Sequence, residues 1–149
     1  MDALTAYASL FAAAFLSATI LPGSSEVVLV MLALEGKRDV ATLLLVATVG
    51  NTLGNVTGWI LGRWFARLVH HRWFPASEAQ LERASAWFRR YGVWALTLAW
   101  VPIVGDALTV VAGTLRVHLG IFIALVGLGK AVRYAVVLWG AETWRSLAM

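Results

Sequence analysis

The stretch VATLLLVATVGNTLGNVTGWILG, residues 40–62, runs for 23 residues without a charged side chain or a proline. A helix needs about 20 predominantly apolar residues to cross the hydrocarbon core of a bilayer. We therefore predict a membrane-spanning helix over 40–62 and work outward from it.

The composition of the whole chain agrees with lipid as its main solvent. Of the 149 residues, 60% are hydrophobic and 13% are charged, whereas soluble domains average about 25% charged residues. The absence of cysteine excludes disulfide scaffolds, thiol redox chemistry and thiolate-bound metals. The net charge of +4 is interpreted as a topology signal. Disordered, fibrous and soluble-enzyme classes are thereby excluded.

Four more apolar segments accompany this helix, at 4–21, 27–34, 93–115 and 119–141. The first lacks the basic flank of a signal peptide, so we expect a retained helix. Pro22 and Gly23 end it, and the eight residues that form the second segment are too few to span a bilayer. Pro102 interrupts the third segment, whereas the fourth is long enough to span.

The connector at 63–92 differs from the rest because it holds six arginines. Positive charge between membrane helices favours the cytoplasmic side, where we expect this connector. Ser77 and Gln80 form a capping-box pattern. The apolar positions that follow at helical spacing are Leu81, Ala84 and Phe88. We predict an amphipathic helix lying on the membrane face.

An internal repeat is indicated at an offset of 80 residues. LPGSSE at 21–26 and VPIVGD at 101–106 each place a proline second and an acid last. At the same offset, Trp59 and Trp64 match Trp139 and Trp144.

The repeat predicts a single membrane domain over 1–149, with one unit at about 4–62, the connector at 63–92 and a second unit at about 93–145. Each unit is a broken apolar hairpin followed by a spanning helix, which makes the fold class an all-α integral membrane protein. The residues expected to shape the breaks are Pro22, Gly23, Pro102 and Gly105. Paired interrupted segments point to a transport site near the midplane of the bilayer.

Glu26 and Asp106 are the acids of the repeat, and each follows a proline where a helix would begin. At the membrane surface such an acid is a first-turn cap. Inside the bilayer it costs about 3 kcal/mol or more, and it needs a partner or a task. Both interpretations stay open on the residues alone.

Lys130 and Arg133 lie near the middle of 119–141, on one face of the predicted helix. Snorkelling to the interface is one explanation, although it mostly serves residues near helix ends. The other is a polar cavity in which these bases pair with Glu26 and Asp106. Such a site can exchange protons or take a phosphate in place of a carboxylate.

The helix at 40–62 carries glycines at intervals of four: Gly50, Gly54, Gly58 and Gly62. Small residues at this spacing allow close helix packing in lipid, which is the favoured interpretation. A dimer surface, and with it a homo-oligomer, is the alternative. Asn51 and Asn55 lie on the adjacent stripe, where they bond across helices or line the cavity.

Other classes of site are not expected. His70 and His71 have no third ligand nearby, so we expect no metal. There is no nucleotide-binding or hydrolase motif, and we expect neither a cofactor nor an enzyme. Apart from Lys130 and Arg133, the basic residues flank membrane segments, which argues against nucleic-acid binding.

Several stretches together resemble the DedA (SNARE-associated, VTT-domain) membrane proteins. LPGSSEVVL at 21–29 resembles the first signature of that family, and FRRYGVWALTLAWVPIVGDALTVVAG at 88–113 resembles the second. GNTLG at 50–54 and GKAVRY at 129–134 look like its small bacterial YqaA-type branch.

The resemblance implies two membrane-dipping hairpins packed with spanning helices in a bacterial inner membrane. It also implies movement of phospholipids or polyprenyl phosphates, with a link to proton-motive force. Embedded acids matter in the family, and the matching positions are Glu26 and Asp106. This chain departs from the family where arginines flank the second proline, because Ala99 and Gly105 stand there.

We therefore expect DedA-type lipid translocation with proton coupling and membrane lipids as partners. In this hypothesis the two acids titrate, and Lys130 and Arg133 bind the phosphate or pair with the acids. A proton-coupled exporter of small cations is the alternative, which requires four fully spanning segments and peripheral bases. A structural or assembly partner without transport is the third hypothesis, and it depends on the glycine face.

Overall fold

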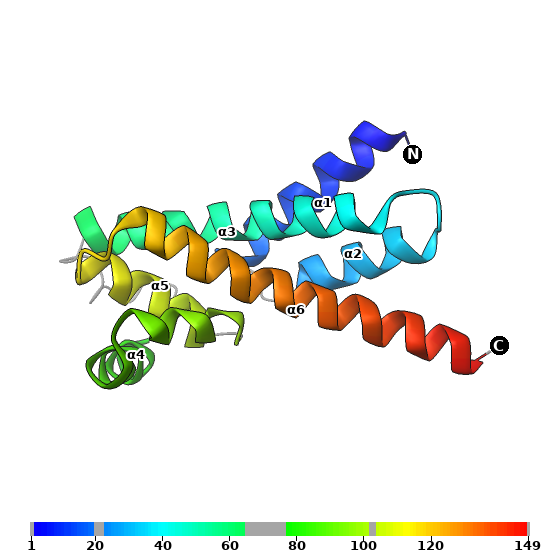
Figure 1. The fold of residues 1–149 in the computed structure, drawn as a ribbon. Coiled ribbons are helices and arrows are strands. Elements are labelled where there is room, and N and C mark those ends of the chain that lie inside the picture. The colour runs from blue at the N-terminus through cyan, green and yellow to red at the C-terminus, as the bar shows by residue number, and fades with distance from the viewer. Residues whose placement is uncertain (1, 20–22, 65–76, 102–103, 149) are drawn as a thin grey trace.

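A computed structural model describes residues 2–19, 23–64, 77–101 and 104–148, and the regular structure in these ranges is all helical. The elements in chain order (Figure 1) are α1 (Ala3–Ser17), α2 (Ser24–Leu34), α3 (Val40–Trp64), α4 (Glu78–Tyr91), the 3₁₀ helix η2 (Gly92–Trp100), α5 (Val104–Thr114) and α6 (Leu119–Ala148). The predicted all-α class is confirmed.

Two helices, α3 and α6, are long and apolar enough to cross a membrane. At 1.5 Å per residue, the 25 residues of α3 and the 30 of α6 extend about 38 Å and 45 Å, against a hydrocarbon core of about 30 Å. They lie side by side (Figure 1). Asn51 contacts Tyr134 and Trp59 contacts Phe122, so the two helices run in opposite directions.

The outer surfaces of these helices are apolar. Leu45 on α3 and Leu128 and Val136 on α6 are 60–63% exposed. Exposed apolar side chains over so much of a helical surface are typical of contact with lipid. Together with the length of the helices, this surface indicates a membrane protein.

Two pairs of short helices accompany α3 and α6: α1 packs with α2, and η2 packs with α5. At 1.5 Å per residue, the 15 residues of α1 and the 11 of α2 extend about 22 Å and 16 Å, too little to cross the bilayer. The short lengths agree with the broken apolar segments expected from the sequence. The dipping of these pairs into the membrane stays a prediction, as does the repeat.

The two halves of the proposed repeat differ in detail. Residues 92–100 form a 3₁₀ helix, whereas the corresponding first segment is the α-helix α1. Trp59 is buried and its Nε1 donates to the carbonyl of Val117 at 3.1 Å, whereas the matching Trp139 is 71% exposed. Trp59 and Trp139 therefore do not share an environment, whereas Trp64 and Trp144 are both exposed.

The glycines of α3 face two different helices. A Cβ on Gly50 or Gly54 would lie 2.8 Å or 2.5 Å from backbone oxygens of α1. Gly58 and Gly62 lie against α5 instead. The missing side chains let α1 pack on the first half of α3 and α5 on the second. The glycine face is thus occupied within the chain, and a dimer through it would have to displace both helices.

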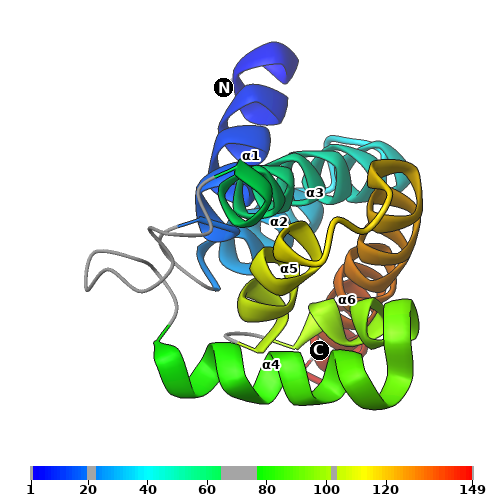
Figure 2. The same cartoon turned by 90° about the vertical axis from the view of Figure 1, so that its left-hand side faces the viewer.

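The helix α4 begins with the predicted capping box. Ser77 Oγ accepts from the Gln80 amide at 3.3 Å, and Gln80 Oε1 accepts from the Ser77 amide at 2.7 Å. Figure 2 shows α4 across the side of the bundle opposite α1.

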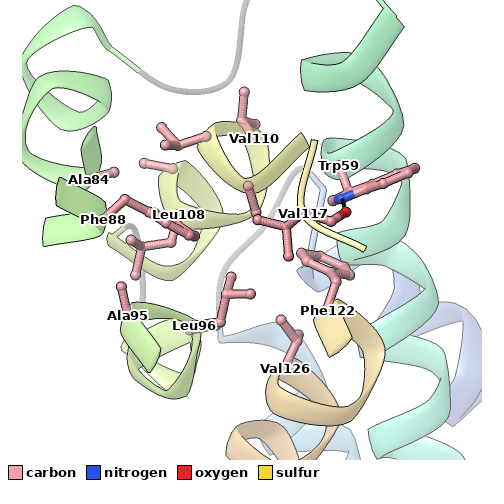
Figure 3. Close-up of a cluster of buried hydrophobic side chains, with 14 of the residues drawn as sticks. Trp59, Ala84, Phe88, Ala95, Leu96, Leu108, Val110, Val117, Phe122 and Val126 are labelled. Atoms are coloured by element: carbon pink, nitrogen blue, oxygen red, sulfur yellow. Dashed lines mark hydrogen bonds between the residues drawn. The ribbon is translucent and has the colours of Figure 1, made fainter. Parts of the chain in front are cut away.

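The apolar face of α4 is covered by protein. Phe88 is 6% exposed and points into a cluster shared with Leu108 of α5 and Leu96 of η2 (Figure 3). A helix lying on the membrane would keep this stripe in lipid, as we expected from the sequence. Here the amphipathic pattern serves packing on η2 and α5 instead.

Candidate functional site

Glu26 and Arg133 form an ion pair that joins α2 to α6. Their side chains are 16% and 17% exposed, so most of the pair is withdrawn from solvent. Arg133 Nη1 also donates to the carbonyl of Trp100, at the end of η2, with a distance of 3.2 Å. One guanidinium therefore connects both short-helix pairs to α6.

Lys130 lies on the same face of α6 as Arg133 and is 3% exposed. Its charge interacts with those of Asp106, Arg133 and Glu26. Asp106 lies partly buried in the first turn of α5, within electrostatic reach of both bases. We call Glu26, Asp106, Lys130 and Arg133 the four-charge centre. Its formal charges sum to zero, and the burial of Lys130 is incompatible with snorkelling of that residue.

The structure thus brings together the four charged residues that the sequence analysis selected. They come from three helices, α2, α5 and α6. Glu26 is in the first turn of α2, so it is placed as a cap and paired with Arg133 at the same time. The capping and pairing interpretations are compatible for this residue.

At both glycines expected to shape the breaks, the local structure requires a residue without a side chain. Gly23 precedes α2 with φ +96°, in the left-handed region that side chains other than glycine rarely adopt. A Cβ on Gly105 would collide with the backbone of Ala99, so α5 could not approach η2 so closely. Pro22 and Pro102 lie outside the described residues.

A chain of buried hydrogen bonds leads away from the four-charge centre. Ser25 Oγ donates to Glu26 Oε2 at 3.4 Å and lies 2.9 Å from the hydroxyl of Tyr134. Asn51 Nδ2 donates to Tyr134 at 3.0 Å, and Asn55 Nδ2 donates to Asn51 Oδ1 at 3.1 Å. The residues of this polar chain, Ser25, Tyr134, Asn51 and Asn55, are at most 3% exposed.

The polar chain includes residues that the sequence analysis missed. Asn51 was selected as an intramembrane amide, and it bonds across to α6. Tyr134 was not selected, although it lies four residues after Lys130 and therefore on the same helix face. Ser25 was not selected either, because a serine beside Glu26 suits the first turn of any helix.

Hollows lined by described residues lie along α4, and one of them extends onto η2. One of about 770 Å³ is lined by residues that include Glu78, Arg83 and Arg89. The other, of about 410 Å³, is lined by residues that include Trp87 and Trp94.

A metal site has no support in the described ranges. No group of three or more His, Asp or Glu side chains there could hold a metal ion. His70 and His71 lie outside the residues that the structure describes.

Similarity to known proteins identifies the family. The VTT domain matches residues 10–141. Inner membrane protein YqaA of Escherichia coli is 48% identical over 129 residues, which cover 87% of this chain and 86% of that protein. An uncharacterized protein of Haemophilus influenzae is 39% identical over 137 residues, covering 87% and 83%.

A more distant relative is named for a substrate. Undecaprenyl phosphate transporter A of Staphylococcus aureus is 24% identical over 155 residues, covering 96% of this chain and 76% of that protein. No solved structure matches the chain. The match to the VTT domain over most of the sequence, supported by the two closer relatives, shows that the chain belongs to the VTT-domain (DedA) family of membrane proteins.

Proposed function

We propose that the protein translocates an anionic lipid, a phospholipid or a polyprenyl phosphate, across the bacterial inner membrane. The four-charge centre binds the phosphate of that lipid. The observation that carries the proposal is the Glu26–Arg133 ion pair, with Lys130 buried beside it. Ionisable groups inside membrane proteins are rare and mark substrate or proton pathways. The name of the Staphylococcus aureus relative supports a lipid phosphate as substrate.

The chemistry is the replacement of one anion by another. A guanidinium binds carboxylate and phosphate through the same fork of N–H donors. In the structure, the guanidinium of Arg133 is paired with the carboxylate of Glu26. When a proton neutralises Glu26, Arg133 is released for the phosphate, and Lys130 supplies a second positive charge. Binding of the lipid anion is thereby coupled to uptake of a proton.

The same exchange opens the centre. Arg133 holds α2 through Glu26 and η2 through the carbonyl of Trp100. A guanidinium that turns to a phosphate weakens both contacts, so the two short-helix pairs separate from α6. Asp106 balances the charge of Lys130 whenever no phosphate is bound. We place the basic connector at 63–92 in the cytoplasm, on the basis of its arginines.

The two alternative functions fit less well. A small-cation exporter requires peripheral bases, whereas Lys130 is 3% exposed and close to both acids. A non-transporting partner protein depends on the glycine face, and α1 and α5 cover that face. Neither alternative explains why two acids and two bases converge inside an apolar helical protein.

The experiment that tests the proposal is lipid translocation in proteoliposomes. Fluorescent phosphatidylglycerol and a short polyprenyl phosphate are the probes, each measured over a range of pH and with empty vesicles as background. Wild-type flux should rise as the pH on the loading side falls, because protonation of Glu26 releases Arg133.

Glu26→Gln is the decisive variant, since the amide mimics the neutral acid. Its flux should lose its dependence on pH, while Glu142→Gln, which alters an exposed acid of α6, should behave as wild type. Failure of folded wild-type protein to move either probe would refute lipid translocation. A Glu26→Gln variant with the wild-type pH dependence would refute the role of Glu26.

A further inference from the structure

The polar chain ends in an oxygen that lacks a donor. Asn55 Nδ2 donates to the backbone carbonyl of Asn51 at 3.0 Å and to its Oδ1 at 3.1 Å. These two bonds fix the orientation of the amide, because a flipped amide would place its oxygen against two other oxygens. Asn55 Oδ1 accepts no hydrogen bond within the described part of the chain, although the residue is only 1% exposed.

A second unpartnered oxygen lies next to it on α3. Thr52 precedes Asn55 by three residues, so their side chains are neighbours on the helix surface. It is 6% exposed, and its Oγ1 likewise has no hydrogen-bond partner among the described residues. Across the helix contact lies Gly127 of α6, where a Cβ would be 3.7 Å from Thr52 Oγ1. Gly127 has no side chain with which to fill this position.

Two neighbouring buried acceptors can be satisfied by one small molecule that donates hydrogen bonds. A buried oxygen without a partner is destabilising, and bulk water does not reach it inside a bilayer. One water molecule donates two hydrogen bonds and can satisfy both oxygens. A metal ion would need more oxygen ligands than these two side chains supply.

The hydrogen-bond directions connect this position to the four-charge centre. Asn55 donates to Asn51, and Asn51 donates to Tyr134. The hydrogen of Tyr134 is therefore left for Ser25. Ser25 Oγ has one hydrogen and two acceptors within reach, Ser17 Oγ at 3.2 Å and Glu26 Oε2 at 3.4 Å. The donors from Asn55 to Tyr134 are all oriented toward Ser25, the serine that is able to donate to Glu26.

We infer that Thr52 and Asn55, opposite Gly127, bind a buried water molecule, and that this water is the first donor of the chain of hydrogen bonds that positions Glu26 beside Arg133. The role in transport rests on the proposed function, whereas the water site does not. The ionisable groups that act on Glu26 are Arg133, Lys130 and Tyr134 of α6, and Asp106 of α5 acts on the two bases. The ligand is water, and Thr52 and Asn55 are positioning residues for the Glu26 carboxylate.

The water site is tested without any substrate. Infrared spectra in D₂O and in D₂¹⁸O reveal internal water as an O–D stretching band that shifts with the oxygen isotope. Wild type should show this band, and Thr52→Val should lose it. The matched control is Thr57→Val on the same helix, because the hydroxyl of Thr57 already donates to the carbonyl of Gly54 at 2.5 Å.

Thermal unfolding gives a second readout with opposite expectations. If a water is bound, Thr52→Val should lower the melting temperature, because the variant removes one hydrogen-bond partner of that water. An unpaired hydroxyl would instead make this nearly isosteric change raise the melting temperature. Absence of an isotope-sensitive band, together with a raised melting temperature in Thr52→Val, would overturn the inference.

Transport reports on the link to Glu26. Loss of the first donor disturbs the hydrogen bonds that position the carboxylate beside Arg133, so the pH midpoint of flux should differ between Thr52→Val and wild type. Thr52→Ser keeps the hydroxyl and should restore the wild-type midpoint. A variant that loses the water band but keeps the wild-type midpoint would refute the positioning role. A wild type that shows the band but moves no lipid would refute the proposed function and leave the water site standing.

Discussion

Replacement of Arg133 by glutamine should show how strongly the four-charge centre is coupled. The change removes the ion pair with Glu26 and the hydrogen bond to the carbonyl of Trp100. It leaves the carboxylate of Glu26 in a site where only 16% of the side chain is exposed. The remaining base within electrostatic reach is Lys130.

The magnitude follows from the burial. Breaking a fully buried ion pair by removing one partner costs about 3–5 kcal/mol. Because Lys130 stays nearby and the pair is partly exposed, we expect the lower end, about 3 kcal/mol, for Arg133→Gln. Glu26→Gln should cost about 2 kcal/mol, since Arg133 keeps the carbonyl of Trp100. In the double variant no charge is left unpaired, and we expect about 3 kcal/mol rather than the sum.

The assay is a double-mutant cycle on reversible unfolding in mixed detergent micelles, followed by the emission of the eight tryptophans. The cycle should yield a coupling free energy of about 2 kcal/mol between Glu26 and Arg133. Glu142 and Arg145 are exposed and three residues apart on α6, so they give a matched control cycle with about 0.3 kcal/mol. Additivity within about 0.5 kcal/mol for the Glu26–Arg133 cycle would refute the argument, because uncoupled groups behave in that way.

Three further predictions concern the fold and its surface. Gly62→Ala should lower stability by about 1–3 kcal/mol through a clash with the backbone of α5, whereas Gly140→Ala, with nothing within 4 Å, should raise it by about 0.5–1 kcal/mol; both are measured by thermal unfolding. Phe88→Ala should destabilise by about 3 kcal/mol if the face of α4 is core, and a loss below about 1 kcal/mol would show that α4 is peripheral. The hydrogen bond from Arg38 lowers the pKa of Glu35, so this pair contributes stability above the ordinary Glu value of 4.5 and loses it as the pH falls. Wild type and Glu35→Gln should therefore have converging melting temperatures in acid and a small difference at neutral pH, and a difference that grows in acid would contradict this sign.

Much of the fold follows from length and hydropathy. Spanning helices are predicted at 40–62 and 119–141, and the structure has helices long and apolar enough to span at Val40–Trp64 and Leu119–Ala148. The capping box at Ser77 sets the start of α4 through local hydrogen bonds, which a sequence pattern captures well. The surface that covers the apolar face of α4 depends on the tertiary structure. Helical periodicity alone does not show whether that surface is protein or lipid.

The charged residues of the candidate site could be predicted from the sequence, because a charge buried in an apolar segment is energetically costly. An acid or a base in the middle of an apolar segment demands a partner, and this requirement selected Glu26, Asp106, Lys130 and Arg133. Hydroxyl groups carry no such signal, because Ser and Thr can satisfy themselves on their own helix. For this reason Ser25 and Thr52 became visible only when α2 and α3 were placed against α6.

The measurement that tests the central claim most directly is lipid flux through Arg133→Gln in proteoliposomes. Arg145→Gln, which alters an exposed arginine near the end of α6, is the control for loss of one positive charge. Loss of the guanidinium that binds the phosphate should lower the flux of both anionic probes by about tenfold or more, equivalent to about 1.4 kcal/mol, while the control keeps the wild-type rate. Equal flux through Arg133→Gln, Arg145→Gln and wild type would contradict phosphate binding at the four-charge centre.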